Sequence, residues 1–258
     1  MLLNLVIMKT TIILFLIMLI ISCGDSLDID TGKNTYHDDI SDISYLYDSF
    51  FTTNFDLSDN AGDQIDLIKL SFNNQDEVYL QDKFDLGLNG QGYLTMTNDG
   101  QDLYLQSRFT QLIFKISSIG EISYSKYDSI GTHWLPSGIA YDTSKDSIIF
   151  LYRNQHYNNQ YRLRLTSKDI ANSSTRDETF MINNIDTTSH GVYCMAYAEP
   201  NLYVLAVQDG ADVLITVDYE ELTILNTEPI ADSTVVGIEV MNNAIYLGYS
   251  DRRIDAFR

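Results

Sequence analysis

The chain has 258 residues, long enough for a sizeable buried core, and it carries 36 acidic against 16 basic side chains, a formal net charge of −20. A negative field repels phosphate backbones, so this charge argues against nucleic acid as a partner. An apolar content of 45% argues against intrinsic disorder, and two cysteines are too few for a disulfide framework or a cysteine-rich zinc site.

An apolar segment near the N-terminus predicts export. Residues 12–21 are an unbroken apolar run preceded by Lys9. Ten helical residues span only about 15 Å of a hydrocarbon core of roughly 30 Å, which is short for a membrane helix. A small residue, Ser22, follows the run, as signal peptidases require. We therefore expect residues 1–22 to be a signal peptide that starts at Met1 or Met8, with an uncleaved anchor as the alternative.

The four residues Ile20-Ile21-Ser22-Cys23 resemble the lipobox of bacterial lipoproteins. That resemblance implies cleavage before Cys23, attachment of a diacylglycerol to its thiol, and acylation of the new amine with chains such as palmitate. Several acyl chains anchor a protein stably to a membrane. We expect residues 23–41 to be this lipidated cysteine and a flexible acidic tether, because the segment has too little apolar content to pack. The expected location is the bacterial cell envelope, as an outer-membrane lipoprotein facing the periplasm or the surface.

The remaining residues, 42–258, are expected to form one all-β domain. Short β-rich runs alternate with turn signals, and four runs share one pattern at starts 45, 54 and 43 residues apart. The segments in this shared role are 102–105, 147–150, 201–204 and 244–247. An earlier strand precedes each of them, a third strand follows, and a fourth strand follows in three cases. A period in the forties with four strands is typical of a β-propeller blade.

Residues 90–258 resemble, at the level of this pattern, the NHL, YVTN and SMP-30-like propeller group, in segments such as 113–122 and 214–222. We expect a propeller of about five, between four and six, four-stranded blades after the signal peptide and tether. Residues 43–51, 64–71 and 77–84 give three further strands. Since propellers often close by strand exchange, residues 43–51 are expected to pair with 253–257, which leaves the other two strands as an incomplete blade. A ring shortened from a longer propeller is the alternative.

A candidate binding site follows from this topology. In a propeller, the loops from fourth to next first strands and the loops from second to third strands share one face. Basic, histidine and tryptophan side chains in those loops are Arg108, His133, Trp134, Arg153, His156, His190 and Arg252. Guanidinium and imidazole groups suit a carboxylate, sulfate or phosphate, and Trp134 offers a face for a sugar ring. The alternative is that these arginines pair with the abundant acids and the histidines are solvated.

The sequence predicts no cofactor and no metal site, with a divalent cation such as calcium left open for an acidic exported protein. The aspartate-rich segment that begins at Asp56 fails as an EF-hand, because Ala61 occupies its sixth position and Leu67 its twelfth. His133 and His190 lack a diagnostic ligand spacing. Cys194 lies in an apolar run and is predicted to be a buried, inert thiol.

These observations favour a lipid-anchored, non-catalytic platform for binding or protein interaction at the cell envelope. Its expected partners are the membrane, through the anchor, and either an envelope protein or an anionic small molecule or glycan. One alternative is a propeller hydrolase or lactonase with its site at the channel mouth. The other is a structural subunit of a larger envelope complex. Whether the protein is an enzyme stays open, with a non-enzyme favoured, because propellers host all three functions.

Overall fold

The computed structural model describes most of the sequence after residue 38. The described ranges are 39–55, 64–72, 78–89, 94–107, 112–117, 121–126, 133–157, 159–167, 174–185, 191–231, 235–250 and 253–257. Within them the protein forms nineteen β-strands and no helix, all in the compact unit Asp38–Arg258. The predicted all-β class is confirmed. The lipobox and most of the predicted tether lie outside the described residues.

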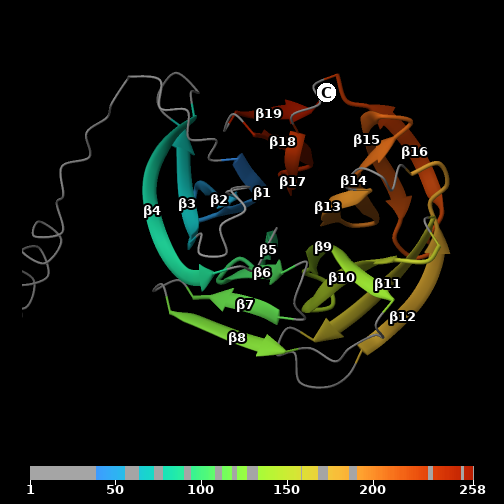
Figure 1. Cartoon of the computed structure of the whole chain (residues 1–258), viewed down its shortest axis with the longest axis horizontal. Coiled ribbons are helices and arrows are strands. Elements are labelled where there is room, and N and C mark those ends of the chain that lie inside the picture. The colour runs from blue at the N-terminus through green and yellow to red at the C-terminus, as the bar shows by residue number, and fades with distance from the viewer. Residues whose placement is uncertain are drawn as a thin grey trace, which may run out of the picture. The chain divides into compact units, whose positions relative to one another are not determined.

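The strands form five antiparallel sheets, or blades, arranged in a ring (Figure 1). Blade 1 consists of β1 (Asp39–Leu46), β2 (Ser49–Phe55), β3 (Gln64–Phe72) and β4 (Val78–Asn89). Blade 2 consists of β5 (Leu94–Asn98), β6 (Leu103–Ser107), β7 (Leu112–Ile116) and β8 (Ile122–Lys126), and blade 3 of β9 (Trp134–Asp142), β10 (Ser147–Asn154), β11 (Gln160–Ser167) and β12 (Ser174–Met181). Blade 4 consists of β13 (Val192–Ala198), β14 (Asn201–Gln208), β15 (Ala211–Asp218) and β16 (Ile224–Pro229), and blade 5 of β17 (Val235–Met241), β18 (Ala244–Tyr249) and β19 (Ile254–Phe257). The molecule is a five-bladed β-propeller.

Burial within each blade explains the sequence pattern that predicted it. The second strands β6 and β10 are buried along nearly their whole length, because a neighbouring blade covers each of their faces. The third strand β11 alternates between buried and half-buried side chains, and the outer strand β16 is almost entirely exposed. Continuous apolar runs therefore mark the second strands, and the period-2 pattern marks the third.

Five hydrophobic clusters hold the ring together, one between each pair of neighbouring blades. The cluster between blades 3 and 4 is the largest and includes Leu163, Val204 and Tyr219. The other four lie between blades 1 and 2, 4 and 5, 2 and 3, and 5 and 1. The first strands β1, β5, β9, β13 and β17 neighbour one another around the central channel (Figure 1). Each blade is thus stabilised by packing on two sides.

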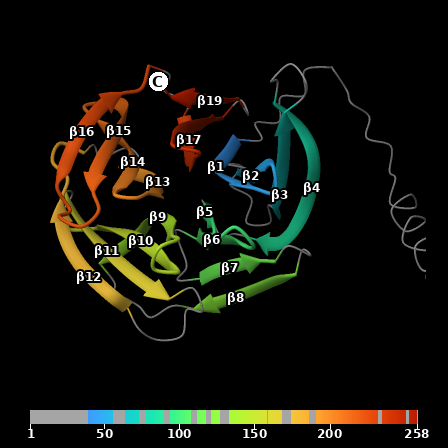
Figure 2. The same cartoon turned by 180° about the vertical axis from the view of Figure 1, so that it is seen from behind.

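The ring closes by side-chain packing, and the predicted closure by strand exchange is wrong. Ile43 and Phe50 of blade 1 pack against Ile254 of blade 5. In the described residues β19 pairs only with β18, so blade 5 has three strands. Figure 2 shows this blade from behind, next to β1. The predicted strand 43–51 is instead a hairpin of β1 and β2, turning at Tyr47 and Asp48, and it pairs with β3. Blade 1 is consequently complete.

The strand roles assigned from the internal repeat are confirmed. The four segments that share one pattern are second strands of their blades, and each follows a first strand across a hairpin. The Asn242-Asn243 turn has both residues in the left-handed region, at φ of 50° and 63°, as a tight two-residue hairpin requires. In the ranges that the structure covers, we find no helix long and apolar enough to cross a membrane.

Candidate functional site

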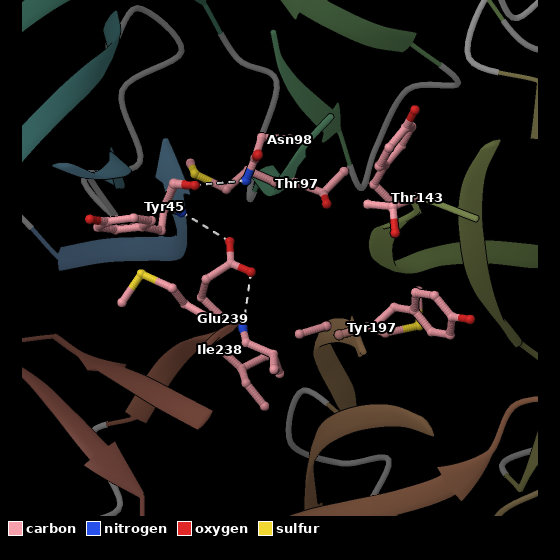
Figure 3. A pocket seen from close by; sticks show the side chains of 13 residues that line it. Tyr45, Thr97, Asn98, Thr143, Tyr197, Ile238 and Glu239 are labelled. Atoms are coloured by element: carbon pink, nitrogen blue, oxygen red, sulfur yellow. Dashed lines mark hydrogen bonds between the residues drawn. The ribbon is translucent and has the colours of Figure 1, made fainter. Parts of the chain in front are cut away.

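A cavity lies at the channel mouth where the hairpins between first and second strands gather (Figure 3). Its volume is about 160 Å³, and thirteen residues from all five blades line it. The lining residues are Tyr45, Met96, Thr97, Asn98, Tyr141, Thr143, Met195, Ala196, Tyr197, Ile238, Glu239, Val240 and Met241. Cavities of about 150 Å³ can hold a six-membered carbon ring, so this one is large enough for a small molecule.

Glu239 is the only acidic side chain among the described residues of this lining, and backbone donors on two blades fix it. Its Oε2 accepts a hydrogen bond of 3.0 Å from the N–H of Tyr45 on β1. Its Oε1 accepts one of 3.0 Å from the N–H of Val240 on its own strand. In Figure 3 the side chain extends from β17 into the space between Tyr45, Thr97 and Tyr197. The carboxylate therefore has a fixed orientation at the cavity.

Behind Glu239, the fully buried Asp42 joins the first strands of three blades. Its Oδ1 accepts hydrogen bonds from the N–H of Ile43 at 2.8 Å and of Ile238 at 3.3 Å. Its Oδ2 accepts one from the N–H of Met96 at 2.9 Å. These donors belong to β1, β17 and β5. One carboxylate thus satisfies three buried backbone donors around the channel.

Burial shifts the acidity of both carboxyl groups. Loss of hydration raises the pKa of Asp42 to about 7, and its three backbone donors oppose the rise while the charge of Glu239 adds to it. Loss of hydration likewise raises the pKa of Glu239 to about 7, against the lowering by the N–H groups of Tyr45 and Val240 and the hydroxyl of Ser44. Both carboxyls therefore titrate near neutral pH.

The predicted binding face lies at the opposite mouth of the channel. Trp134 begins β9 and Thr143 follows its end, and nine strand residues at about 3.3 Å each span about 30 Å. Two predicted site residues, His133 and His156, meet there. The ring nitrogens Nε2 of His156 and Nδ1 of His133 are 2.8 Å apart, and the carbonyl of His133 accepts the N–H of Gln155 at 2.8 Å. Arg153, at the end of β10, lies beside this pair in sequence and strand register.

Arg153 has a buried guanidinium nitrogen. Its Nη1 is inaccessible to solvent and has no hydrogen-bond partner in the part of the protein that the structure describes. The guanidinium reaches blade 4, since a Cβ added at Gly191 would lie 2.8 Å from Nη1. The positive charge of Arg153 lowers the pKa of the fully buried Tyr161, but burial outweighs this effect and raises that pKa to about 12. A buried donor without an acceptor is energetically costly, so an anionic acceptor at this position would stabilise it.

The other predicted site residues divide into two sets. Trp134 packs against the cluster between blades 2 and 3, and the Arg162 guanidinium carbon lies 5.7 Å from its ring centroid, so it serves packing. Arg108, His190, Arg252 and Cys23 lie outside the described residues. Cys194 is buried, as predicted, and its Sγ lies 2.9 Å from the carbonyl of Val236.

Sequence reasoning missed the two channel carboxyls. Asp42 follows a polar, acidic stretch in which nothing distinguishes it from solvated acids. Glu239 had a usable signal, because it is the one charged residue in the apolar run Val235–Met241. No group of three or more His, Cys, Asp or Glu side chains suitable for a metal ion occurs among the residues described.

A closed ring of five blades with a cavity in its channel defines the class, a β-propeller. The sequence matches no protein-family model and no curated protein. Among solved structures, it is similar to glutaminyl cyclase of Myxococcus xanthus, with 12% identity, a TM-score of 0.57, and coverage of 86% of this chain and 93% of that one. At this identity the likeness shows the fold alone.

Two further similar structures have lower scores. Virginiamycin B lyase from Staphylococcus aureus, as a catalytically inactive form with quinupristin, has 16% identity, a TM-score of 0.45, and coverage of 87% of this chain and 72% of that one. The PQQ-bound aldose sugar dehydrogenase from Streptomyces coelicolor has 11% identity, a TM-score of 0.45, and coverage of 80% of this chain and 70% of that one.

Proposed function

We propose that this protein is a lipid-anchored platform of the bacterial cell envelope that binds an anionic group of a small molecule, glycan or envelope protein. The observation that carries the proposal is the buried Nη1 of Arg153, without a partner among the described residues, at a channel mouth. A guanidinium supplies charge and directed donors to a carboxylate, sulfate or phosphate. The neighbouring imidazoles of His133 and His156 provide further donors.

The first test removes the guanidinium groups. We expect the double substitution Arg108→Gln and Arg153→Gln to weaken binding of an anionic ligand by about 10- to 100-fold, because one charge-assisted hydrogen bond contributes about 1.5–3 kcal/mol. The melting temperature should stay nearly unchanged, since Arg153 Nη1 has no described partner to lose. Calorimetric titration with sulfate, phosphate, citrate and glucuronate measures the affinity.

The control is Lys145→Gln. Lys145 lies in the hairpin after β9, at the opposite end of that strand from Trp134, and forms an exposed ion pair of 2.9 Å with Glu220, so this change removes a positive charge away from the proposed site. The control should bind the anion as the original protein does. Equal affinity in the double variant and the control would overturn the anion site. Turnover of a lactone would instead support the hydrolase alternative, and stable co-purification with envelope proteins alone would support the structural subunit.

The second test concerns the anchor. We expect Cys23→Ser to move the protein from the membrane fraction to the soluble fraction and to abolish labelling with radioactive palmitate, because the lipobox thiol is the proposed acceptor of the lipid. Cell fractionation and metabolic labelling measure both effects. Cys194→Ser is the control, because Cys194 is buried and should leave both unchanged. Membrane retention and labelling in the Cys23→Ser protein would contradict the lipoprotein assignment.

A further inference from the structure

We propose that the cavity around Glu239 binds a compact organic cation, of the alkylammonium class, with the Glu239 carboxylate as its counter-ion. The site lies at the opposite channel mouth from Arg153 and is independent of the anion site. Three properties of the lining lead to this ligand class: its charge, the chemistry of its remaining side chains, and its volume.

The charge of the lining is uncompensated. None of the thirteen described residues around the cavity is Lys, Arg or His, and Glu239 is their one carboxylate. The donors that hold it, the N–H groups of Tyr45 and Val240, are neutral. The buried carboxyl of Asp42 lies close enough for the charge of Glu239 to raise its pKa. An anion would therefore be repelled, whereas a cation would gain an attraction that the low local dielectric strengthens.

The remaining side chains favour an organic cation over a metal ion. Calcium takes six to eight oxygen ligands, and the lining offers one carboxylate whose two oxygens already accept backbone hydrogen bonds. The other polar groups of the lining are neutral, such as the hydroxyl and amide groups of Thr97, Asn98 and Thr143, and an organic cation needs no complete shell of charged oxygens. Met96, Met195 and Tyr141 line the cavity only in part, because their side chains are buried in the clusters between neighbouring blades.

The volume limits the size of the ligand. A cavity of about 160 Å³ is close to one that holds benzene, so a trimethylammonium group fits and a peptide does not. In Figure 3, Thr97 lies across this space from Glu239, whereas the Tyr197 ring extends away from it. The cation would thus sit between the carboxylate of blade 5 and the Thr97 side chain of blade 2.

The experiment compares two probes of the same shape and different charge. Choline and its neutral isostere 3,3-dimethyl-1-butanol are titrated into the full-length protein in detergent at pH 8, where a carboxyl with a pKa of about 7 is ionised. We expect at least tenfold tighter binding of choline. Glu239→Gln should abolish that preference, while Glu221→Gln, an exposed control in the turn after β15, should keep it.

Thr97→Leu is a second variant, which fills the cavity and leaves Glu239 in place. It should weaken choline binding at least tenfold even if Glu239→Gln fails to fold. Equal binding of the two probes, binding unaffected by Thr97→Leu, or displacement of choline by equimolar calcium would each overturn the proposal. Because the mouths are separate, Arg153→Gln should not alter choline binding, so failure of either proposal is recognised independently.

Discussion

Replacing Asp42 with alanine is expected to lower the melting temperature by roughly 6–12 °C. The substitution leaves the N–H groups of Ile43, Met96 and Ile238 buried without an acceptor. An unsatisfied buried donor costs about 1–3 kcal/mol, and part of the total is offset because the burial of a carboxyl is also relieved. A net loss of about 3 kcal/mol corresponds to this shift in a domain of this size. A thermal melt followed by circular dichroism measures it.

Asp255→Ala is the control for Asp42→Ala. Asp255 is an exposed acid on β19 whose ion pair with Arg253 is of the surface kind, which contributes about 0–1 kcal/mol. Its removal should shift the melting temperature by no more than about 3 °C. Similar melting of Asp42→Ala and Asp255→Ala would show that the three backbone donors find other acceptors, and that Asp42 does not hold the ring.

Gly237→Ala should be somewhat less damaging than Asp42→Ala. We expect the free energy of unfolding to fall by about 2–3 kcal/mol, which lowers the melting temperature by roughly 5–10 °C. A Cβ at this position would lie 2.6 Å from the backbone nitrogen of Ile43 and 2.9 Å from two backbone atoms of Asp42. Backbone atoms cannot rotate away, so blades 5 and 1 must move apart. The same thermal melt measures the loss.

Gly100→Ala separates crowding from backbone strain. Gly100 has nothing within 4 Å of an added Cβ, but its φ of 85° disfavours a side chain by about 1–2 kcal/mol. Gly237→Ala should be the more destabilising of the two. If Gly100→Ala costs as much or more, the close approach of β17 to β1 is not tight, and the ring tolerates a wider gap there.

Blades 2 to 5 could be predicted from the sequence because their hairpins carry ordinary turn residues, such as Asn242-Asn243 and Asp209-Gly210. Blade 1 could not, because its first hairpin turns at Tyr47 and Asp48, which adopt φ of 52° and 55° without a glycine or asparagine to mark them. The sequence therefore predicts one long strand where two short ones pair. That single missed turn also produced the wrong closure.

Of the two candidate sites, one could be predicted from the sequence and the other could not. Topology alone placed His133, Arg153 and His156 on one face, because loop positions follow from strand roles. The cavity at the other mouth depends on which first-strand side chains face the channel and on which acids are buried. Neither the burial of Asp42 nor its place at the channel can be predicted from its neighbours in the sequence, since two of its backbone donors, Met96 and Ile238, are 54 and 196 residues away.

The bond from the Ile238 N–H to Asp42 joins positions 196 residues apart, and it has a consequence for how the protein folds. Contacts this distant in sequence require a large loop to close first, so they slow folding. During synthesis on a ribosome, blade 1 exists long before β17 is available. Until then the Asp42 carboxylate lacks one donor, and the faces of Ile43 and Phe50 that later meet blade 5 are uncovered. Closure of the ring should therefore be the last and slowest folding step. Before closure, blade 1 should be the blade that most depends on protection from aggregation.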